Sequence, residues 1–123
     1  QNAIYLGTAI GTNNIILLTI NNLRDYQTDK KSNKKTLIVL FGKQFGKIEI
    51  MSMLFISYIS FFLLSAELNN YNLFYSILLS IPLALNISYD TYHLSGEKLN
   101  KTLPKIASFL ILQCILLGIG IYI

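Results

Sequence analysis

Long apolar runs alternate with short polar segments along this 123-residue chain. Residues 2–22, 50–66, 71–89 and 106–123 contain no Asp, Glu, Lys or Arg. A helix rises about 1.5 Å per residue, so runs of this length cross most of the hydrocarbon layer of a bilayer. The pattern therefore predicts four membrane-spanning helices, over about residues 2–23, 49–67, 71–89 and 105–123.

The segments between these runs differ from one another. Residues 30–47 are expected to form a basic connector, in which a short amphipathic helix over residues 37–45 lies at the membrane interface. The third run contains Pro82, which is expected to kink its helix because proline removes a backbone hydrogen bond. In the first run, Ala3, Gly7, Gly11, Asn14 and Leu18 share one helical face, which is expected to pack inside a bundle or to line a route to the polar end.

Composition places the whole chain in a lipid bilayer. Hydrophobic residues make up 53% of the sequence, charged residues only 13%, and the mean hydropathy is +0.51. A soluble domain of this size is far less apolar. We therefore expect an all-α, polytopic membrane helical bundle in which residues 1–123 belong to one transmembrane domain.

Basic residues are concentrated in two of the polar segments. The formal net charge is +4, and seven of the ten Lys and Arg residues lie between Arg24 and Lys47. Cytoplasmic loops carry such an excess, so this pattern indicates membrane topology rather than binding to nucleic acid. It predicts that both basic segments lie on one side of the membrane, and for Lys43 and Lys47 we favour this topological role.

Two acids follow the first apolar run at helical spacing. If the helix continues to Asp29, then Asn21, Asp25 and Asp29 share a face with neighbours about 6 Å apart. Two carboxylates at this distance repel by roughly 3 kcal/mol at an effective dielectric of about 20, which favours recruitment of a cation. Mg²⁺ prefers carboxylate oxygens, so the pair predicts part of a metal and phosphate site. The alternative is a solvated pair neutralised by Arg24 and Lys30.

These acids lie within a longer motif, N-N-x-R-D-x-x-x-D over residues 21–29, followed by K-x-T-L over residues 34–37. The motif resembles the second aspartate-rich motif of the UbiA superfamily of membrane prenyltransferases, and most closely that of the 1,4-dihydroxy-2-naphthoate polyprenyltransferases. Asn33 replaces the glycine expected before the lysine and still tolerates a left-handed turn. Leu40 stands where a basic residue is often found, which leaves phosphate binding to the lysines.

The resemblance implies a bundle of nine transmembrane helices with two aspartate-rich motifs. The first motif, N-x-x-x-D-x-x-x-D, has no counterpart in these 123 residues. We therefore expect the chain to be the C-terminal part of a UbiA-type domain, with four of its helices and half of its catalytic site. By itself it is expected to be inactive.

The activity implied by the resemblance is transfer of a polyprenyl or phytyl group from its diphosphate to 1,4-dihydroxy-2-naphthoate, in menaquinone or phylloquinone biosynthesis. Mg²⁺ would be held by Asp25 and Asp29. Five further residues would bind the diphosphate, namely Asn21, Arg24, Lys30, Lys34 and Lys35. Arg24 would otherwise hold the carboxylate of the acceptor.

Two other functions stay open. The acceptor is a different aromatic compound in other branches of the family, and a non-catalytic multispan membrane protein or remnant would share the composition. The abundance of Asn, Ile, Lys, Tyr and Phe is typical of an AT-rich genome. It is consistent with a multi-pass protein of a plastid membrane or a bacterial inner membrane.

Overall fold

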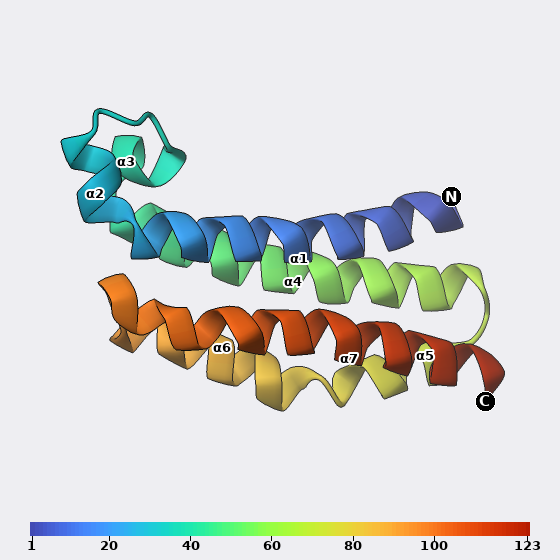
Figure 1. The fold of residues 1–123 in the computed structure, drawn as a ribbon. Helices are drawn as coiled ribbons and strands as arrows, with labels where there is room; N and C mark the ends of the chain where they lie inside the picture. Colours follow the sequence, from blue (N-terminus) through green and yellow to red (C-terminus); the bar gives the residue numbers. More distant parts are fainter.

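The computed structural model describes residues 1–123, and all of its regular secondary structure is helical (Figure 1). Its elements are α1 (Asn2–Arg24), α2 (Tyr26–Lys31), α3 (Leu37–Phe41), α4 (Lys43–Glu67), α5 (Tyr71–Leu78), α6 (Ile81–His93), a 3₁₀ helix η1 (Gly96–Lys101) and α7 (Thr102–Tyr122). The prediction of an all-α bundle is confirmed.

Three stretches are long and apolar enough to cross a membrane, namely α1, α4 and the continuous stretch of η1 with α7. A fourth span is present if α5 and α6 are counted together, because they are bent by 44° at a short break. Pro82 lies in the first turn of α6, and its missing N–H cannot donate to the preceding turn. The interruption expected at Pro82 is therefore a break between two helices.

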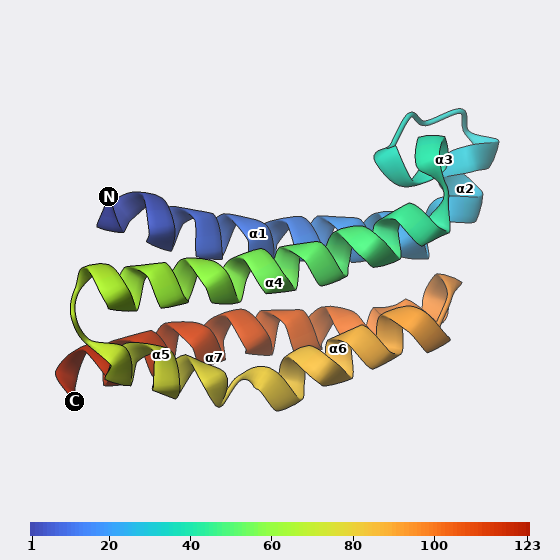
Figure 2. The ribbon, with the colours of Figure 1, turned by 180° about the vertical axis from the view of Figure 1, so that it is seen from behind.

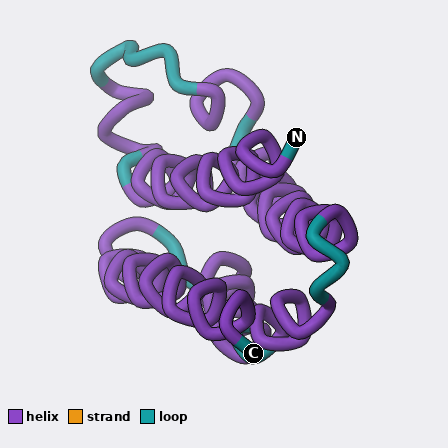
Figure 3. The backbone as a smooth tube through the Cα atoms, turned by 90° about the vertical axis from the view of Figure 1, so that its right-hand side faces the viewer, coloured by secondary structure: helices purple, strands orange, loops and turns teal.

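The spans form two layers, which the end-on view in Figure 3 separates. Helices α1 and α4 lie side by side in one layer, and α7 lies with α5 and α6 in the other (Figures 1 and 2). Elements α2, α3 and η1 lie at one end of the bundle, whereas both termini and the turn after α4 lie at the other. The basic segments thus share one end, which is the arrangement that the charge pattern predicts.

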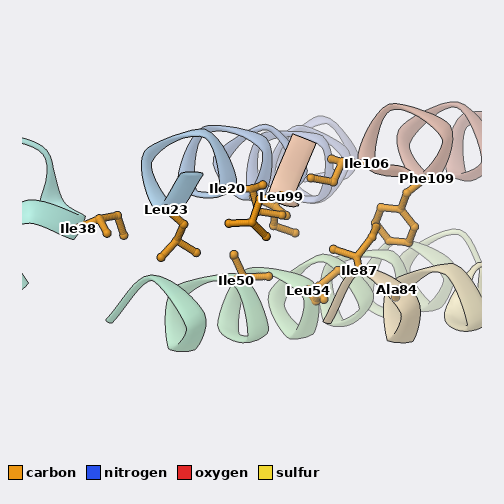
Figure 4. Close-up of a cluster of buried hydrophobic side chains, with 11 residues drawn as sticks. Ile20, Leu23, Ile38, Ile50, Leu54, Ala84, Ile87, Leu99, Ile106 and Phe109 are labelled. Carbon is orange, nitrogen blue, oxygen red and sulfur yellow. The ribbon is translucent and has the colours of Figure 1, made fainter. Parts of the chain in front are cut away.

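Two clusters of buried side chains hold the layers together. The larger one has 11 residues and includes Ile20, Ile50, Ile87 and Phe109, which come from α1, α4, α6 and α7 (Figure 4). A second cluster of 6 residues lies around Phe61 and Leu73. Because lipid tails are as apolar as these side chains, close packing between the helices stabilises the contact more than removal from water does.

The inward face of α1 is not the one expected from its small residues. Ala3, Gly7, Asn14 and Leu18 are exposed, while Ala9, Asn13, Ile16 and Ile20 are buried. A Cβ added at Gly7 or Gly11 would meet no atom within 4 Å. Within residues 1–123 the face predicted to pack therefore has no packing partner; both faces of α1 carry helically spaced apolar residues, so spacing alone does not select the buried one.

The basic connector is shorter than expected. Gly42 has a φ of 89°, which allows a sharp turn between α3 and α4, and α4 begins at Lys43. The short helix accordingly covers residues 37–41, whereas a helix over residues 37–45 was predicted. Thr36 caps it, since its hydroxyl accepts a hydrogen bond from the Val39 N–H at 3.2 Å. Asn33 adopts a φ of 56°, a left-handed conformation that asparagine tolerates.

Candidate functional site

The motif residues lie where α1 ends at the polar end of the bundle. Asp25 N–H donates to the Asn21 carbonyl at 3.0 Å, and Asp29 N–H donates to the Asp25 carbonyl at 2.9 Å. The three residues therefore remain one helical turn apart, as the spacing predicts. The backbone of Asp25, with φ −89° and ψ 4°, separates the two helices, and α2 turns away from the axis of α1 (Figure 1).

Asp25 is held by the guanidinium group that precedes it. Arg24 donates from Nε to Oδ1 and from Nη2 to Oδ2, both at 2.7 Å. This bidentate pairing matches the planar geometry of the guanidinium group. The hydrogen bonds and charge of Arg24 hold the pKa of the Asp25 carboxyl below its usual value. Arg24 also donates from Nη1 to Oδ1 of Asn100 in η1 at 3.2 Å, which links the motif to a distant segment.

Asp29 has a different environment. It is buried, and Lys34 Nζ lies 3.3 Å from both of its carboxylate oxygens. Lys30 instead lies over the ring of Tyr26, with its Nζ 5.9 Å from the ring centroid. Of the pairs proposed as an alternative to a metal site, the one with Arg24 is present, and Lys34 replaces Lys30 in the other.

Asp25 opens onto a cavity of about 480 Å³ between the end of α1 and η1. No hydrophobic residue lines it; its lining residues are Arg24, Asp25, Gln27, Thr28, Gly96, Glu97 and Asn100. Of the predicted site residues, this cavity brings together Arg24 and Asp25. Asp29 and Lys34 form a separate pair beside it, and Asn21, Lys30 and Lys35 do not line it.

The oxygen donors of this cavity fit a hard divalent cation on the side of Asp25. Carboxylate, carboxamide and hydroxyl oxygens are ligands that Mg²⁺ and Ca²⁺ accept. No three His, Cys, Asp or Glu side chains gather closely enough to hold a metal ion. Asp25, with a side chain 39% exposed, can reach a cation in the cavity, whereas the Asp29 carboxylate is turned toward Lys34.

Sequence reasoning missed the contribution of η1. Glu97 and Asn100 line the cavity, although nothing in their local sequence distinguishes them. The available signal was topological, since the count of crossings places residues 90–105 on the same membrane side as the motif. Asp90, another acid of that segment, does not line the cavity; it is buried and pairs with Lys105 at 2.6 Å.

Comparison with known families finds that the model of the UbiA prenyltransferase family matches residues 1–118. The matched range includes the motif, the cavity around Asp25 and α7 up to its last turn. No curated protein and no solved structure matches the chain. The family match therefore agrees with the resemblance carried by residues 21–37.

Proposed function

The chain belongs to the UbiA prenyltransferase family, and from this premise we propose that it transfers a polyprenyl or phytyl group to 1,4-dihydroxy-2-naphthoate as part of a longer enzyme. The observation that carries this acceptor is the motif N-N-x-R-D-x-x-x-D followed by K-x-T-L. Menaquinone or phylloquinone biosynthesis would use the product, in a plastid membrane or a bacterial inner membrane.

The position of the cavity supports a donor that has a charged head and an apolar tail. The cavity lies where the apolar spans reach the polar end of the bundle, and its lining is entirely polar or glycine. A prenyl diphosphate placed there would keep its diphosphate among charged side chains. Its tail would extend along the spans, whose outward side chains include Ile4, Leu18 and Phe55.

The reaction breaks the allylic C–O bond of the donor, and diphosphate leaves with the electron pair. Groups that bind the leaving diphosphate more strongly as its charge grows accelerate this step. Lys34 and Lys35 are exposed beside the motif and would neutralise phosphate oxygens, together with Lys30. Asp25 would hold Mg²⁺ from the cavity and Asp29 would hold it after exchanging Lys34 for the metal, and the ion would supply further neutralisation of that charge.

The acceptor ring then forms the new carbon–carbon bond. In 1,4-dihydroxy-2-naphthoate the ring carbon that bears the carboxylate attacks the prenyl cation, and the carboxylate departs as CO₂. Asn21, half-buried in the last turn of α1, would support the metal or the diphosphate from below. Arg24 already spans Asp25 and Asn100, so it would keep the carboxylate of Asp25 oriented toward the cavity.

We further propose that turnover needs a second aspartate-rich segment, N-x-x-x-D-x-x-x-D, supplied by a longer chain. Asp25 and Asp29 provide only two acids, and each already has a cationic partner. Residues 1–123 alone should therefore show no prenyl transfer. Turnover by residues 1–123 purified by themselves would contradict this part of the proposal.

The acceptor is tested with the full-length protein in lipid nanodiscs with Mg²⁺ and a prenyl diphosphate. We expect product from 1,4-dihydroxy-2-naphthoate, with a mass that includes loss of CO₂, and little product from homogentisate or 4-hydroxybenzoate. Product masses followed over time measure this preference. Faster turnover of either other acceptor would assign the chain to another branch of the family.

A further inference from the structure

A second cavity lies at the polar end of the bundle, enclosed by the ends of α1, α4, α6 and η1. Its volume is about 120 Å³. Its lining contains three leucines and five polar residues from α4, α6 and the turn after α6. The polar residues are Lys43, Gln44, Lys47, Thr91 and Ser95. It contains none of the residues that the motif assigns to diphosphate or metal binding.

The charge of this cavity is uncompensated. Its lining includes two lysines and no acid. Lys43 and Lys47 are both half-buried, and neither forms an ion pair. The Lys43 Nζ lies 5.0 Å from the centroid of the Tyr26 ring. The Lys47 Nζ donates to the Tyr92 carbonyl at 3.1 Å and lies 5.2 Å from the centroid of the Tyr92 ring. These contacts position the ammonium groups without neutralising them.

No acid of the chain forms an ion pair with either lysine. Asp25 pairs with Arg24, Asp29 with Lys34, and Asp90 with Lys105. Glu49, two residues after Lys47 on α4, accepts a hydrogen bond from Thr19 at 2.7 Å, and Glu97 lines the cavity around Asp25. Because no acid lines the cavity, Lys43 and Lys47 are free to bind an anion from outside the chain.

The dimensions and walls of the cavity suit one oxyanion group. Its volume holds a carboxylate or a single phosphate group, and it is too small for a whole prenyl donor. Leucine walls reduce the local dielectric, so the attraction between an ammonium and an oxyanion is stronger there than in water. Gln44 and Ser95 add neutral donors, which would complete the hydrogen bonds of the anion.

This second cavity adjoins the one around Asp25. Leu23, Ser95 and Leu99 line the second cavity, and the residue that follows each of them lines the cavity around Asp25, namely Arg24, Gly96 and Asn100. The two cavities therefore flank the contact between the end of α1 and η1. A substrate that occupies one can extend a charged group into the other.

We propose that the cavity of Lys43 and Lys47 binds an oxyanion of one substrate, either the carboxylate of the aromatic acceptor or a phosphate group of the prenyl donor. This inference builds on the proposed function, because it takes its two candidate anions from that reaction. It gives both lysines a role in substrate binding, in addition to their effect on topology.

The test compares Lys43→Gln/Lys47→Gln with the control Lys98→Gln, which removes the same type of charge from an exposed site on the same end of the bundle. Binding of 1-hydroxy-2-naphthoate and of inorganic diphosphate to the full-length protein is measured by titration calorimetry in detergent. We expect the double variant to lose at least tenfold in affinity for one anion, and the control to stay within twofold. A loss of affinity for the naphthoate assigns the cavity to the carboxylate of the acceptor, and a loss of affinity for diphosphate assigns it to a phosphate group of the donor.

A measurement on the native protein avoids any effect of substitution on folding. Each anion in turn is added during modification of lysines by an acetylating reagent, followed by peptide mass spectrometry. The anion that binds should slow modification of Lys43 and Lys47 at least threefold, and leave Lys98 unchanged. The proposal would be overturned if the double variant kept its affinity for both anions, or if neither anion protected Lys43 and Lys47 from modification.

Binding and turnover separate this inference from the proposed function. If the full-length protein fails to prenylate 1,4-dihydroxy-2-naphthoate but loses anion binding in the double variant, the anion site stands and the acceptor assignment fails. If turnover occurs and the double variant keeps both its affinities and its KM values, the acceptor assignment stands and the anion site fails.

Discussion

Asp25 and Asp29 are identical side chains one helical turn apart, yet the chain surrounds them differently. The Asp25 side chain is 39% exposed and opens onto the polar cavity, whereas that of Asp29 is 10% exposed and faces Lys34. The difference arises because Asp25 lies at the junction of α1 and α2, while Asp29 lies within α2 beneath the loop that carries Lys34. Substitution of the two residues should therefore affect stability to different degrees.

Asp25→Asn and Asp29→Asn are each expected to reduce prenyl transfer by the full-length protein at least 100-fold, since loss of one group that stabilises transition-state charge costs about 10²–10³ in rate. Both variants should also lower the free energy of unfolding, each by about 0.2–1 kcal/mol, because each leaves a cation without its partner, and Asp29→Asn should lower it more because the Asp29 side chain is the less exposed of the two. Product formation and thermal unfolding measure the two effects. Glu67→Gln, at the opposite end of the bundle, is the control, and near-native turnover in either Asp variant would refute the metal assignment.

The pairing of Asp25 with Arg24 also predicts a pH dependence. The folded-state pKa of Asp25 lies below its value in the unfolded chain, so the pair stabilises the fold above pH of about 3.9. This contribution disappears as the pH falls through the lower, folded-state pKa. Since the carboxylate is partly exposed, the pair contributes only about 0.2–1 kcal/mol.

Arg24→Gln should therefore raise the pKa of Asp25 toward that of an unpaired aspartate. Carboxyl carbon NMR of the labelled protein in detergent, followed as a function of pH, measures the midpoint in both forms. A native midpoint at or above about 3.9 would contradict the pairing.

At the scale of the elements, the contact between α5 and α7 depends on one close approach. A Cβ at Gly120 would lie 2.5 Å from the Leu73 Cα and 2.5 Å from the Ser76 Oγ. The Ser76 hydroxyl lies 2.8 Å from the carbonyl oxygen of Leu116, and Asn70 donates to the Gly120 carbonyl at 3.0 Å. Small residues and side-chain hydrogen bonds of this kind allow membrane helices to pack closely.

Gly120→Ala is accordingly expected to lower the free energy of unfolding by about 1–3 kcal/mol, because the backbone of α5 must move away. Gly118→Ala is the matched control, since a Cβ there meets no atom within 4 Å. Gly46→Ala should fall between them, because its closest contact is the flexible end of Ile38. Thermal unfolding of the three variants in the same detergent gives this order, and equal stability of the variants at 118 and 120 would contradict it.

At the scale of the whole molecule, a polar network joins the two layers near the middle of the spans. Asn13 of α1 donates to Gln113 of α7 at 2.6 Å, and Gln113 donates to Ser80 at 3.5 Å. Ser80 lies at the break between α5 and α6, 2.7 Å from the hydroxyl of Tyr58 on α4. All four spans are thus connected, which selects one register for each helix.

Gln113→Leu should destabilise the bundle by about 0.6–1.7 kcal/mol, the range measured for hydrogen bonds between membrane helices. The substitution leaves the Asn13 Nδ2 without its acceptor, and the Asn13 Oδ1 already has no hydrogen-bond partner. The double variant Asn13→Leu/Gln113→Leu should recover part of this loss, because no unpaired amide remains. Unfolding of the single and double variants in detergent measures the coupling, and strictly additive losses would show that the pair does not interact.

The sequence by itself determined the helical spans, the polar end and the spacing of the motif. These features depend on local properties, namely the length of each apolar run, the period of the helix and the distribution of Lys and Arg along the chain. The positions of Asn21, Asp25 and Asp29 on successive turns follow from the same period. The family itself was accessible for this reason, because its motif is contiguous.

Only the tertiary structure decided which groups meet. It selected Asn13 rather than Asn14 for the interior of the bundle, placed Asn100 against Arg24 across 76 positions of sequence, and enclosed Lys43 and Lys47 in a cavity. Both faces of α1 are apolar enough for lipid, so the choice between them depends on how the other spans pack. Contacts between distant segments depend on the packing of all four spans together, which no local pattern specifies.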